Sequence, residues 1–141
     1  SIVVVTRNRA DKLTRCLDAL SLAMSGRRDC EVVIADNGST DRTASLVRER
    51  AGTDERIRLV QESAPGLPRA FNAAVGTTRG DIIGCIDDDC YVTPSYVTDV
   101  LAIFDALPAL DYCGGRILLY DARDARLTIQ ERTVRRDYEP Y

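Results

Sequence analysis

Short, largely apolar segments alternate with segments of helical periodicity along most of this chain. The apolar segments fall at residues 2–5, 31–35, 56–60 and 82–86. Short apolar runs bounded by turn residues are typical of strands buried on both faces of a parallel sheet. Their alternation with helices predicts β-α-β units. We therefore expect an α/β fold with a Rossmann-like, mainly parallel sheet flanked by helices.

Four helical segments follow these strands in turn. The first predicted helix carries an apolar stripe at helical spacing, made of Leu13, Cys16, Leu17, Leu20 and Met24. The second begins after the polar turn at residues 36–41 and runs towards Gly52. The third and fourth are expected to bury one face each, formed by Leu67, Phe71, Ala74 and Val75, and by Val97, Val100, Leu101 and Phe104.

Beyond the fourth helix the pattern changes. Residues 112–120 have strand character, and a turn at residues 121–124 leads to the apolar residues 127–129, so we expect a hairpin there. The expected division is an α/β domain over residues 1–120, followed by a hairpin or an incomplete further region over residues 121–141.

The length and composition bound the class of protein. The chain has 141 residues, the size of one domain, of which 45% are hydrophobic and 29% charged. No apolar stretch approaches the roughly 20 residues that a membrane-spanning helix needs. These features predict a soluble globular domain without a transmembrane segment. The chain opens on Ser1 without an initiator methionine, so we expect a segment of a longer protein.

Charge and cysteine content narrow the partners and the compartment. A net charge of −3 gives no electrostatic reason to expect nucleic acid as a partner. Five cysteines, odd in number and mostly among apolar neighbours, predict buried thiols in a reducing compartment. We therefore expect a cytoplasmic location, or one at the inner face of a membrane through parts outside this sequence. The chain has no histidine and no C-x-x-C spacing, which argues against a zinc site.

Three consecutive carboxylates, Asp87, Asp88 and Asp89, end the fourth predicted strand. At about 6 Å and an effective dielectric constant of about 20, each pair of like charges costs on the order of 3 kcal/mol. A hard divalent cation that also binds substrate phosphates would relieve this repulsion. The alternative is a solvated loop before the next helix, although Thr93 and Pro94 already supply a good helix start.

Polar residues also follow two other predicted strands. They are residues 6–9, with sequence TRNR, and the pair Asp36 and Asn37. Each of these segments alone is equally compatible with an ordinary loop or turn. The carboxyl ends of parallel strands meet at one edge, where ligands bind in open α/β sheets. Together with the acids they predict a site for a nucleotide and a metal.

These segments, in this order, resemble the inverting family 2 glycosyltransferases, which have a GT-A fold. The resemblance covers residues 2–120 and includes residues 5–9, 33–41, 65–74 and 80–89. It implies that residues 1–120 are the nucleotide-sugar donor domain and that the chain is cut short before its acceptor site. It also implies a D-x-D motif in which Asp87 and Asp89 bind Mg or Mn, which bridges the diphosphate, with Asp88 near the ribose.

The resemblance further implies the residues that bind the nucleotide sugar. They are Thr6, Arg7, Asn8, Arg9, Asp36, Asn37, Arg69, Asn72, Asp87 and Asp88. One member of the Asp36–Asn37 pair would read the base edge. The chain departs from the family at Arg7, where relatives often have an aromatic residue, and at Phe71, where they commonly have an arginine.

The implied reaction is direct displacement at the anomeric carbon of the donor sugar. UDP is the nucleotide that the resemblance most often implies, with GDP and dTDP as alternatives, and the acceptor would be a carbohydrate, a lipid or a protein. A carboxylate would deprotonate the acceptor. No acid between Asp121 and Tyr141 matches the family's base motif, so we expect the base beyond Tyr141.

Other classes of protein remain open at the level of sequence. A nonenzymatic nucleotide-binding fragment or regulatory relative would share the same motifs. A haloacid-dehalogenase-type phosphatase also has an apolar strand that ends in D-x-D, although its nucleophile strand normally comes early in the domain. A nicotinamide dehydrogenase fits poorly, because residues 6–10 contain no glycine.

Overall fold

The computed structural model describes residues 1–121 and 123, and it divides the chain into two compact units, residues 1–103 and 104–141. The first unit is built on a sheet of four parallel strands in the order β3-β2-β1-β4. The strands are β1 (Ile2–Thr6), β2 (Val32–Asp36), β3 (Ile57–Gln61) and β4 (Gly84–Asp87). The predicted α/β fold and parallel sheet are confirmed.

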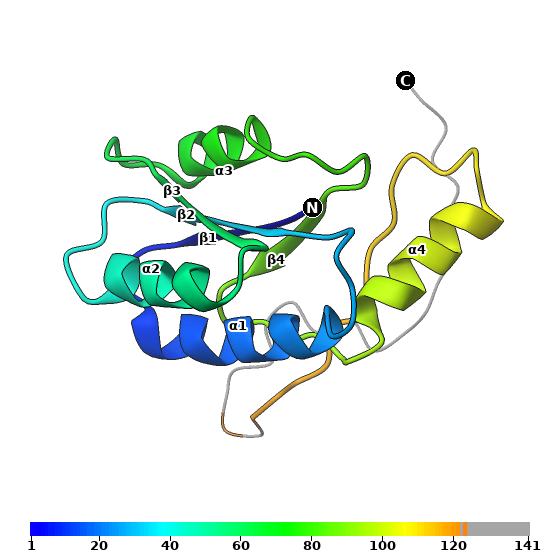
Figure 1. The fold of residues 1–141 in the computed structure, drawn as a ribbon, viewed down its shortest axis with the longest axis horizontal. Coiled ribbons are helices and arrows are strands. Elements are labelled where there is room, and N and C mark those ends of the chain that lie inside the picture. Colours follow the sequence, from blue (N-terminus) through cyan, green and yellow to red (C-terminus); the bar gives the residue numbers. More distant parts are fainter. Residues whose placement is uncertain (122, 124–141) are drawn as a thin grey trace. The chain divides into compact units, whose positions relative to one another are not determined.

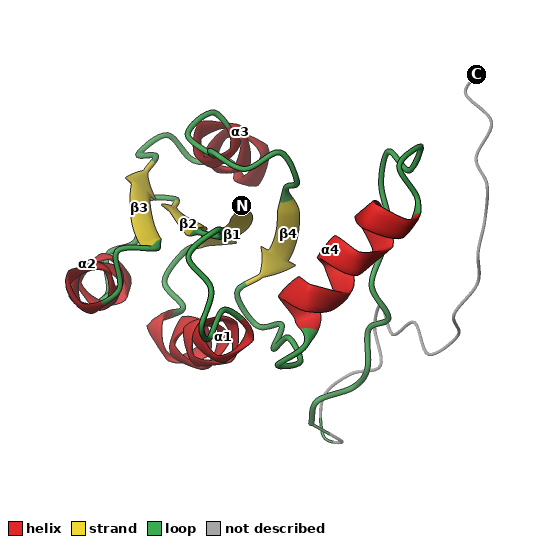
Figure 2. Cartoon of the chain, turned by 45° about the vertical axis from the view of Figure 1, so that its right-hand side comes forward, coloured by secondary structure: helices red, strands yellow, loops and turns green. Residues whose placement is uncertain are grey.

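Helices cover both faces of this sheet. Helices α1 (Ala10–Ala23) and α2 (Thr43–Thr53) lie on one face, and α3 (Leu67–Val75) lies on the other (Figures 1 and 2). Helix α3 packs on the central strands β1 and β2, and α2 packs mainly against β3. Helix α1 contacts α2 and shares an apolar layer with residues of β1 and β2. Val3, Val4, Val33 and Ile34 of the central strands are 1% exposed or less. The core therefore consists of two apolar layers separated by the sheet.

The predicted stripe of α1 is confirmed, because all five of its residues are buried in the layer shared with α2. Burying one such side chain contributes about 1.5–3 kcal/mol. In α3 the buried residues are Ala70 and Ala74, with Phe71 and Val75 packed beside them. The prediction that Leu67 faces inward is wrong. It is 65% exposed, because it opens the first turn of α3.

Helix α4 (Tyr96–Ala106) follows β4. Its Val97 is buried, and Tyr96 and Leu101 pack against the same apolar layer as α1. The predicted inward positions of Val97 and Leu101 are therefore confirmed. Val100 and Phe104 are half-buried. No helix among residues 1–121 is long and apolar enough to cross a membrane.

The predicted strand over residues 112–120 is wrong. These residues form a single isolated bridge at Ile117, and Tyr112, Leu118 and Tyr120 are exposed. Apolar alternation produces a strand only when a neighbouring strand completes its hydrogen bonds. The expected partner at residues 127–129 lies outside the described residues, and the division at residue 120 stays a prediction.

Of the five cysteines predicted to be mostly buried, only Cys16 is fully buried. All five are free, but Cys85 and Cys113 are exposed and Cys30 and Cys90 are half-buried. Cys85 is exposed because β4 is the last strand of the described sheet and leaves one face uncovered. Burial, with a smaller effect of Asp88, raises the pKa of Cys16 to about 12, so this thiol stays protonated.

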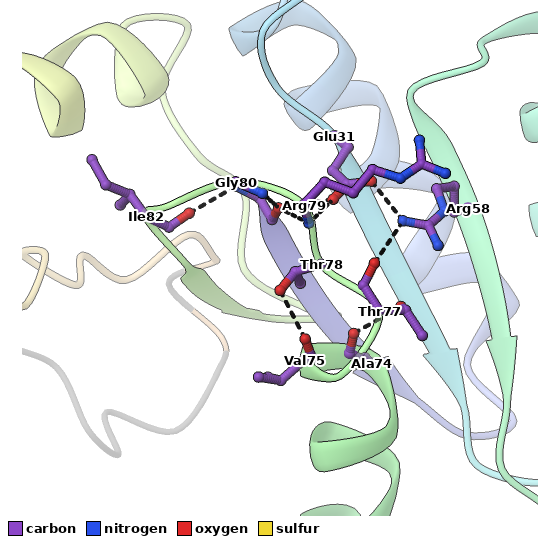
Figure 3. Close-up of polar contacts among 10 residues, drawn as sticks. Glu31, Arg58, Ala74, Val75, Thr77, Thr78, Arg79, Gly80 and Ile82 are labelled. Atoms are coloured by element: carbon purple, nitrogen blue, oxygen red, sulfur yellow. Dashed lines mark hydrogen bonds and ion pairs between the residues drawn. The ribbon is translucent and has the colours of Figure 1, made fainter.

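A polar network centred on Glu31 closes the amino-terminal edge of the sheet (Figure 3). Glu31 is 8% exposed and accepts hydrogen bonds from Arg58 Nη1, Ser1 Oγ and the Arg79 amide, each at 2.8 Å. Arg58 also donates to the Thr77 carbonyl at 2.9 Å. Burial opposes ionisation of Glu31, but these donors outweigh it and hold the Glu31 pKa below its ordinary value. The network thereby joins β1, β2 and β3 to the connection between α3 and β4.

Candidate donor-binding site

The predicted polar segments meet at the carboxyl edge of the sheet, opposite the Glu31 network. Thr6 and Asp36 are the last residues of β1 and β2 and lie in register with each other. Asp87 ends β4, in register with Val5 of β1. The predicted convergence of these three strand ends is therefore confirmed.

Asp88 is turned into the protein rather than towards solvent. It is 3% exposed, and its two carboxylate oxygens accept hydrogen bonds from Thr6 Oγ1 at 2.7 Å and from Arg9 Nη1 at 2.6 Å. Partial burial disfavours the charge of Arg9, but Asp88 and Asp89 outweigh this effect and raise the Arg9 pKa. Asp88 thus joins the loop after β4 to the loop after β1.

Asp87 and Asp89 lie close enough together for a single cation to contact both. One ligand atom from each of Asp87, Asp89 and Cys90 lies within 4.8 Å of the other two. Asp87 is exposed and Asp89 is half-buried. Burial, followed by Asp87 and Asp89, raises the pKa of Cys90, so its sulfur stays a soft thiol. The two carboxylates fit Mg or Mn, which prefer oxygen ligands, and Cys90 does not.

Two cations already neutralise Asp89. Lys12 Nζ and Arg9 Nη2 each lie 3.2 Å from Asp89 Oδ2. Lys12 was not among the predicted site residues. It lies in the first turn of α1, three residues after Arg9, which directly precedes the helix, and both side chains reach Asp89. That spacing was the available signal.

Asn8 has a structural role in the loop after β1. Its φ of 53° lies in the left-handed region, which asparagine tolerates better than most residues. Its Oδ1 accepts hydrogen bonds from the amides of Thr40 at 2.7 Å and Asp41 at 3.3 Å, and its own amide donates to Ser39 Oγ at 2.9 Å. Asn8 therefore holds the loop after β1 against the loop after β2.

The members of the Asp36–Asn37 pair have different surroundings. Asn37 Nδ2 donates to the carbonyls of Glu62 at 3.1 Å and Ala64 at 2.8 Å, and its Oδ1 accepts from the Gly66 amide at 2.9 Å. These three bonds use most of the capacity of a side-chain amide. Asp36 is 1% exposed, and its Oδ1 accepts from the Ser39 amide at 3.0 Å. Asn37 thus shapes the loop before α3. This loop ends at Gly66, whose φ of 137° favours glycine.

Three predicted site residues, Arg7, Arg69 and Asn72, are exposed. Arg7 lies in the loop after β1, whereas Arg69 and Asn72 lie on α3, on the other face of the sheet from α1. None of these three side chains makes a hydrogen bond or ion pair within residues 1–121. The structure thus brings together Thr6, Arg9, Asp87, Asp88 and Asp89, with Asp36 at the neighbouring strand end.

The sequence of this chain is similar to those of known glycosyltransferases. The sequence model of the family described as Glycosyl transferase family 2 matches residues 1–139. A chondroitin synthase from Pasteurella multocida (strain Pm70) is 36% identical over 98 residues, which cover 69% of this chain and 10% of the synthase. A hyaluronan synthase from Pasteurella multocida has the same identity and coverage. The chain thus spans about a tenth of the length of these relatives.

Solved structures show the same architecture. TarS 1–349 from S. aureus, in complex with UDP, matches with a TM-score of 0.68 and 25% identity, over 74% of this chain and 31% of that one. Mannosyltransferase PcManGT from Pyrobaculum calidifontis, in complex with GDP-Man and Mn2+, matches with a TM-score of 0.55 and 32% identity, over 62% of this chain and 26% of that one. The predicted GT-A fold is confirmed.

Proposed function

This chain belongs to Glycosyl transferase family 2, and from that premise we propose that it forms the donor-binding part of an enzyme that moves a sugar from a nucleoside diphosphate to an acceptor. The observation that carries the proposal is the meeting of three strand ends at one edge. There the ligand atoms of Asp87 and Asp89 lie within reach of a single ion.

Asp87 and Asp89 are the proposed holders of Mg or Mn. When bound, such an ion would stabilise the negative charge of the departing nucleoside diphosphate. Asp88 positions the site instead of binding metal, because it is buried and its carboxylate is turned towards Thr6 and Arg9. Direct displacement with inversion, and a catalytic base outside residues 1–121, remain parts of the proposal.

The nucleoside is proposed to bind beside Thr6 and Asp36. Asp36 suits the base edge better than Asn37, because Asn37 is occupied by the loop at residues 62–66, whereas no bond within the described part uses Asp36 Oδ2. The exposed Arg7 is available to stack on the base through its guanidinium plane. Arg69 and Asn72 are weaker candidates for donor contacts, since α3 lies on the other face of the sheet from α1. Asn8 is a weaker candidate because its side chain is bonded to the loop after β2.

UDP is the proposed donor nucleotide, because TarS of similar fold was solved with UDP. GDP is the alternative that PcManGT suggests, since it was solved with GDP-Man. The acceptor, whether carbohydrate, lipid or protein, and the cytoplasmic location stay predictions from the sequence.

Calorimetric titration tests the proposed site. UDP, GDP and dTDP would be titrated into the chain with Mn²⁺ and again with EDTA. We expect one nucleotide to bind in a metal-dependent manner, and Asp89→Asn to weaken that binding at least about tenfold, because a carboxylate ligand is lost. Asp81→Asn is the matched control, since Asp81 is an exposed acid near the opposite end of β4. Binding that persists in EDTA, or no binding of any nucleotide, would refute the proposal.

A further inference from the structure

The position of Lys12 raises a question that the proposed metal site does not answer. Its ammonium lies 3.2 Å from Asp89 Oδ2, the same oxygen that Arg9 Nη2 contacts at 3.2 Å. A carboxylate oxygen that serves a divalent cation cannot keep both of these cations at this distance without strong repulsion. One of the two must give way when the metal binds.

The structure distinguishes the two cations. Arg9 is anchored by its second nitrogen, which lies 2.6 Å from an oxygen of the buried Asp88. Within the described part, the Lys12 ammonium has Asp89 as its single ion-pair partner, and its side chain is 53% exposed. A lysine ammonium is also a compact charge on a flexible stem, which moves more readily than a forked guanidinium. Lys12 is therefore the cation that can leave.

We propose that Lys12 is a donor-binding residue that neutralises Asp89 before the donor arrives and then moves to the donor's diphosphate. This inference depends on the proposed function, because it needs Asp89 as a metal ligand. The diphosphate is the anion that would enter the site together with the metal, so it supplies the new partner for the ammonium. Metal alone must compete with Lys12, whereas metal with diphosphate does not.

The consequence is coupling between metal and diphosphate. Each ligand removes a cost that the other would otherwise meet, so the two bind cooperatively and by equal factors in both directions. Lys12 would also contribute to selection of a diphosphate over a monophosphate, since the ammonium needs an anion close to the metal.

Three variants isolate this effect. Lys12→Met removes the charge and retains an unbranched apolar stem, and Lys12→Arg keeps a cation at the same position. Arg15→Met is the matched control, because Arg15 is an exposed cation on the same helix that makes no ion pair with the acids. The Mn²⁺ affinity of each nucleotide-free variant is measured from the electron paramagnetic resonance signal of free Mn²⁺. The affinities for UDP and UMP are then measured by calorimetry at saturating Mn²⁺.

We expect two shifts of opposite sign in Lys12→Met. Mn²⁺ should bind the nucleotide-free chain about three- to tenfold more tightly, and UDP should bind about three- to tenfold more weakly in the presence of Mn²⁺. UMP affinity should not change, Lys12→Arg should stay near the native values, and Arg15→Met should match the native chain throughout.

Two results would overturn the inference in distinguishable ways. If native UDP binding depends on Mn²⁺ and on Asp89 but Lys12→Met leaves Mn²⁺ affinity unchanged or shifts both affinities in the same direction, this inference alone is wrong. If native UDP binding is independent of Mn²⁺, the proposed function is wrong as well. Circular dichroism melts would verify that every variant is folded.

Discussion

At the scale of single residues, the three consecutive aspartates divide the work of the site. Asp88 points inward, to Thr6 and Arg9, whereas Asp87 is exposed and Asp89 is half-buried. A carboxylate can hold two loops in this way because it accepts hydrogen bonds on both oxygens and balances the charge of the arginine. The middle acid therefore has a structural role, and the outer two are the acids that we propose to bind the metal.

Replacing Asp88 should destabilise the protein more than replacing Asp87. Asp88→Asn keeps the shape but removes the charge opposite Arg9 at a buried position, so we expect a loss of about 1–2 kcal/mol in the free energy of unfolding. Asp87→Asn should stay within about 0.5 kcal/mol, because exposed positions without partners tolerate substitution. Urea denaturation of both variants measures the difference, and equal losses would argue against the structural role of Asp88.

At the scale of secondary-structure elements, polar side chains join the loops at both ends of the strands. The carboxyl edge is held by Asn8, Asn37 and Asp88, which join successive loops. The amino edge is held by Glu31, which joins β2 to Arg58 of β3 and to the amide of Arg79. Buried strands leave the loop groups at each edge without backbone partners, and these side chains provide them.

Loss of the Glu31 charge should destabilise the chain in a pH-dependent manner. Glu31→Gln should lower the free energy of unfolding at pH 7 by about 1–3 kcal/mol, because it weakens a buried charged hydrogen-bond acceptor. The pKa of Glu31 is lower in the folded chain than in the unfolded one. Its stabilisation is therefore fully present above the unfolded pKa and is lost as the pH falls through the folded pKa.

Urea midpoints at pH 7 and at about pH 3 measure this effect, the acid value lying below the ordinary glutamate pKa. The difference between Glu31→Gln and the native chain should shrink at the lower pH. Glu55→Gln is the control, because Glu55 is exposed and its side chain makes no hydrogen bond within residues 1–121. A difference that stays constant with pH would show that Glu31 acts by packing alone.

At the scale of the whole molecule, the proposed ligands should stabilise the fold. The site is assembled from β1, β2 and β4, so it exists only in the folded chain. A ligand that binds only the folded state at a concentration of 100 times its Kd adds about 2.7 kcal/mol to the free energy of unfolding.

We therefore expect UDP with Mn²⁺ to raise the thermal midpoint by several degrees, as a shift of this size does in a domain of about 100–150 residues. EDTA should abolish the increase, and Asp89→Asn should show almost none. Differential scanning calorimetry provides the measurement. An equal increase in Asp89→Asn would place the nucleotide away from the acids.

Local pattern was enough to predict most of the fold and the edge that carries the site. The apolar residues of α1 recur at every helical turn, and each strand is a short apolar run. Both signals can be read from a few neighbouring residues. The strand at residues 112–120 and the inward face of Leu67 were mispredicted, because each depends on whether another element lies beside it.

The amino-acid sequence alone was enough to predict the parallel α/β fold and the places of Thr6, Asp36 and Asp87 at the ends of their strands. Periodicity and strand order are sufficient for this, because the carboxyl ends of parallel strands share an edge. The contacts that each polar side chain makes there could be learned from the folded structure and not from the sequence. The bonds from Thr6 to Asp88 and from Lys12 to Asp89 join residues 82 and 77 positions apart. No local pattern specifies which side chains meet across such separations, because the meeting depends on how the sheet and helices pack.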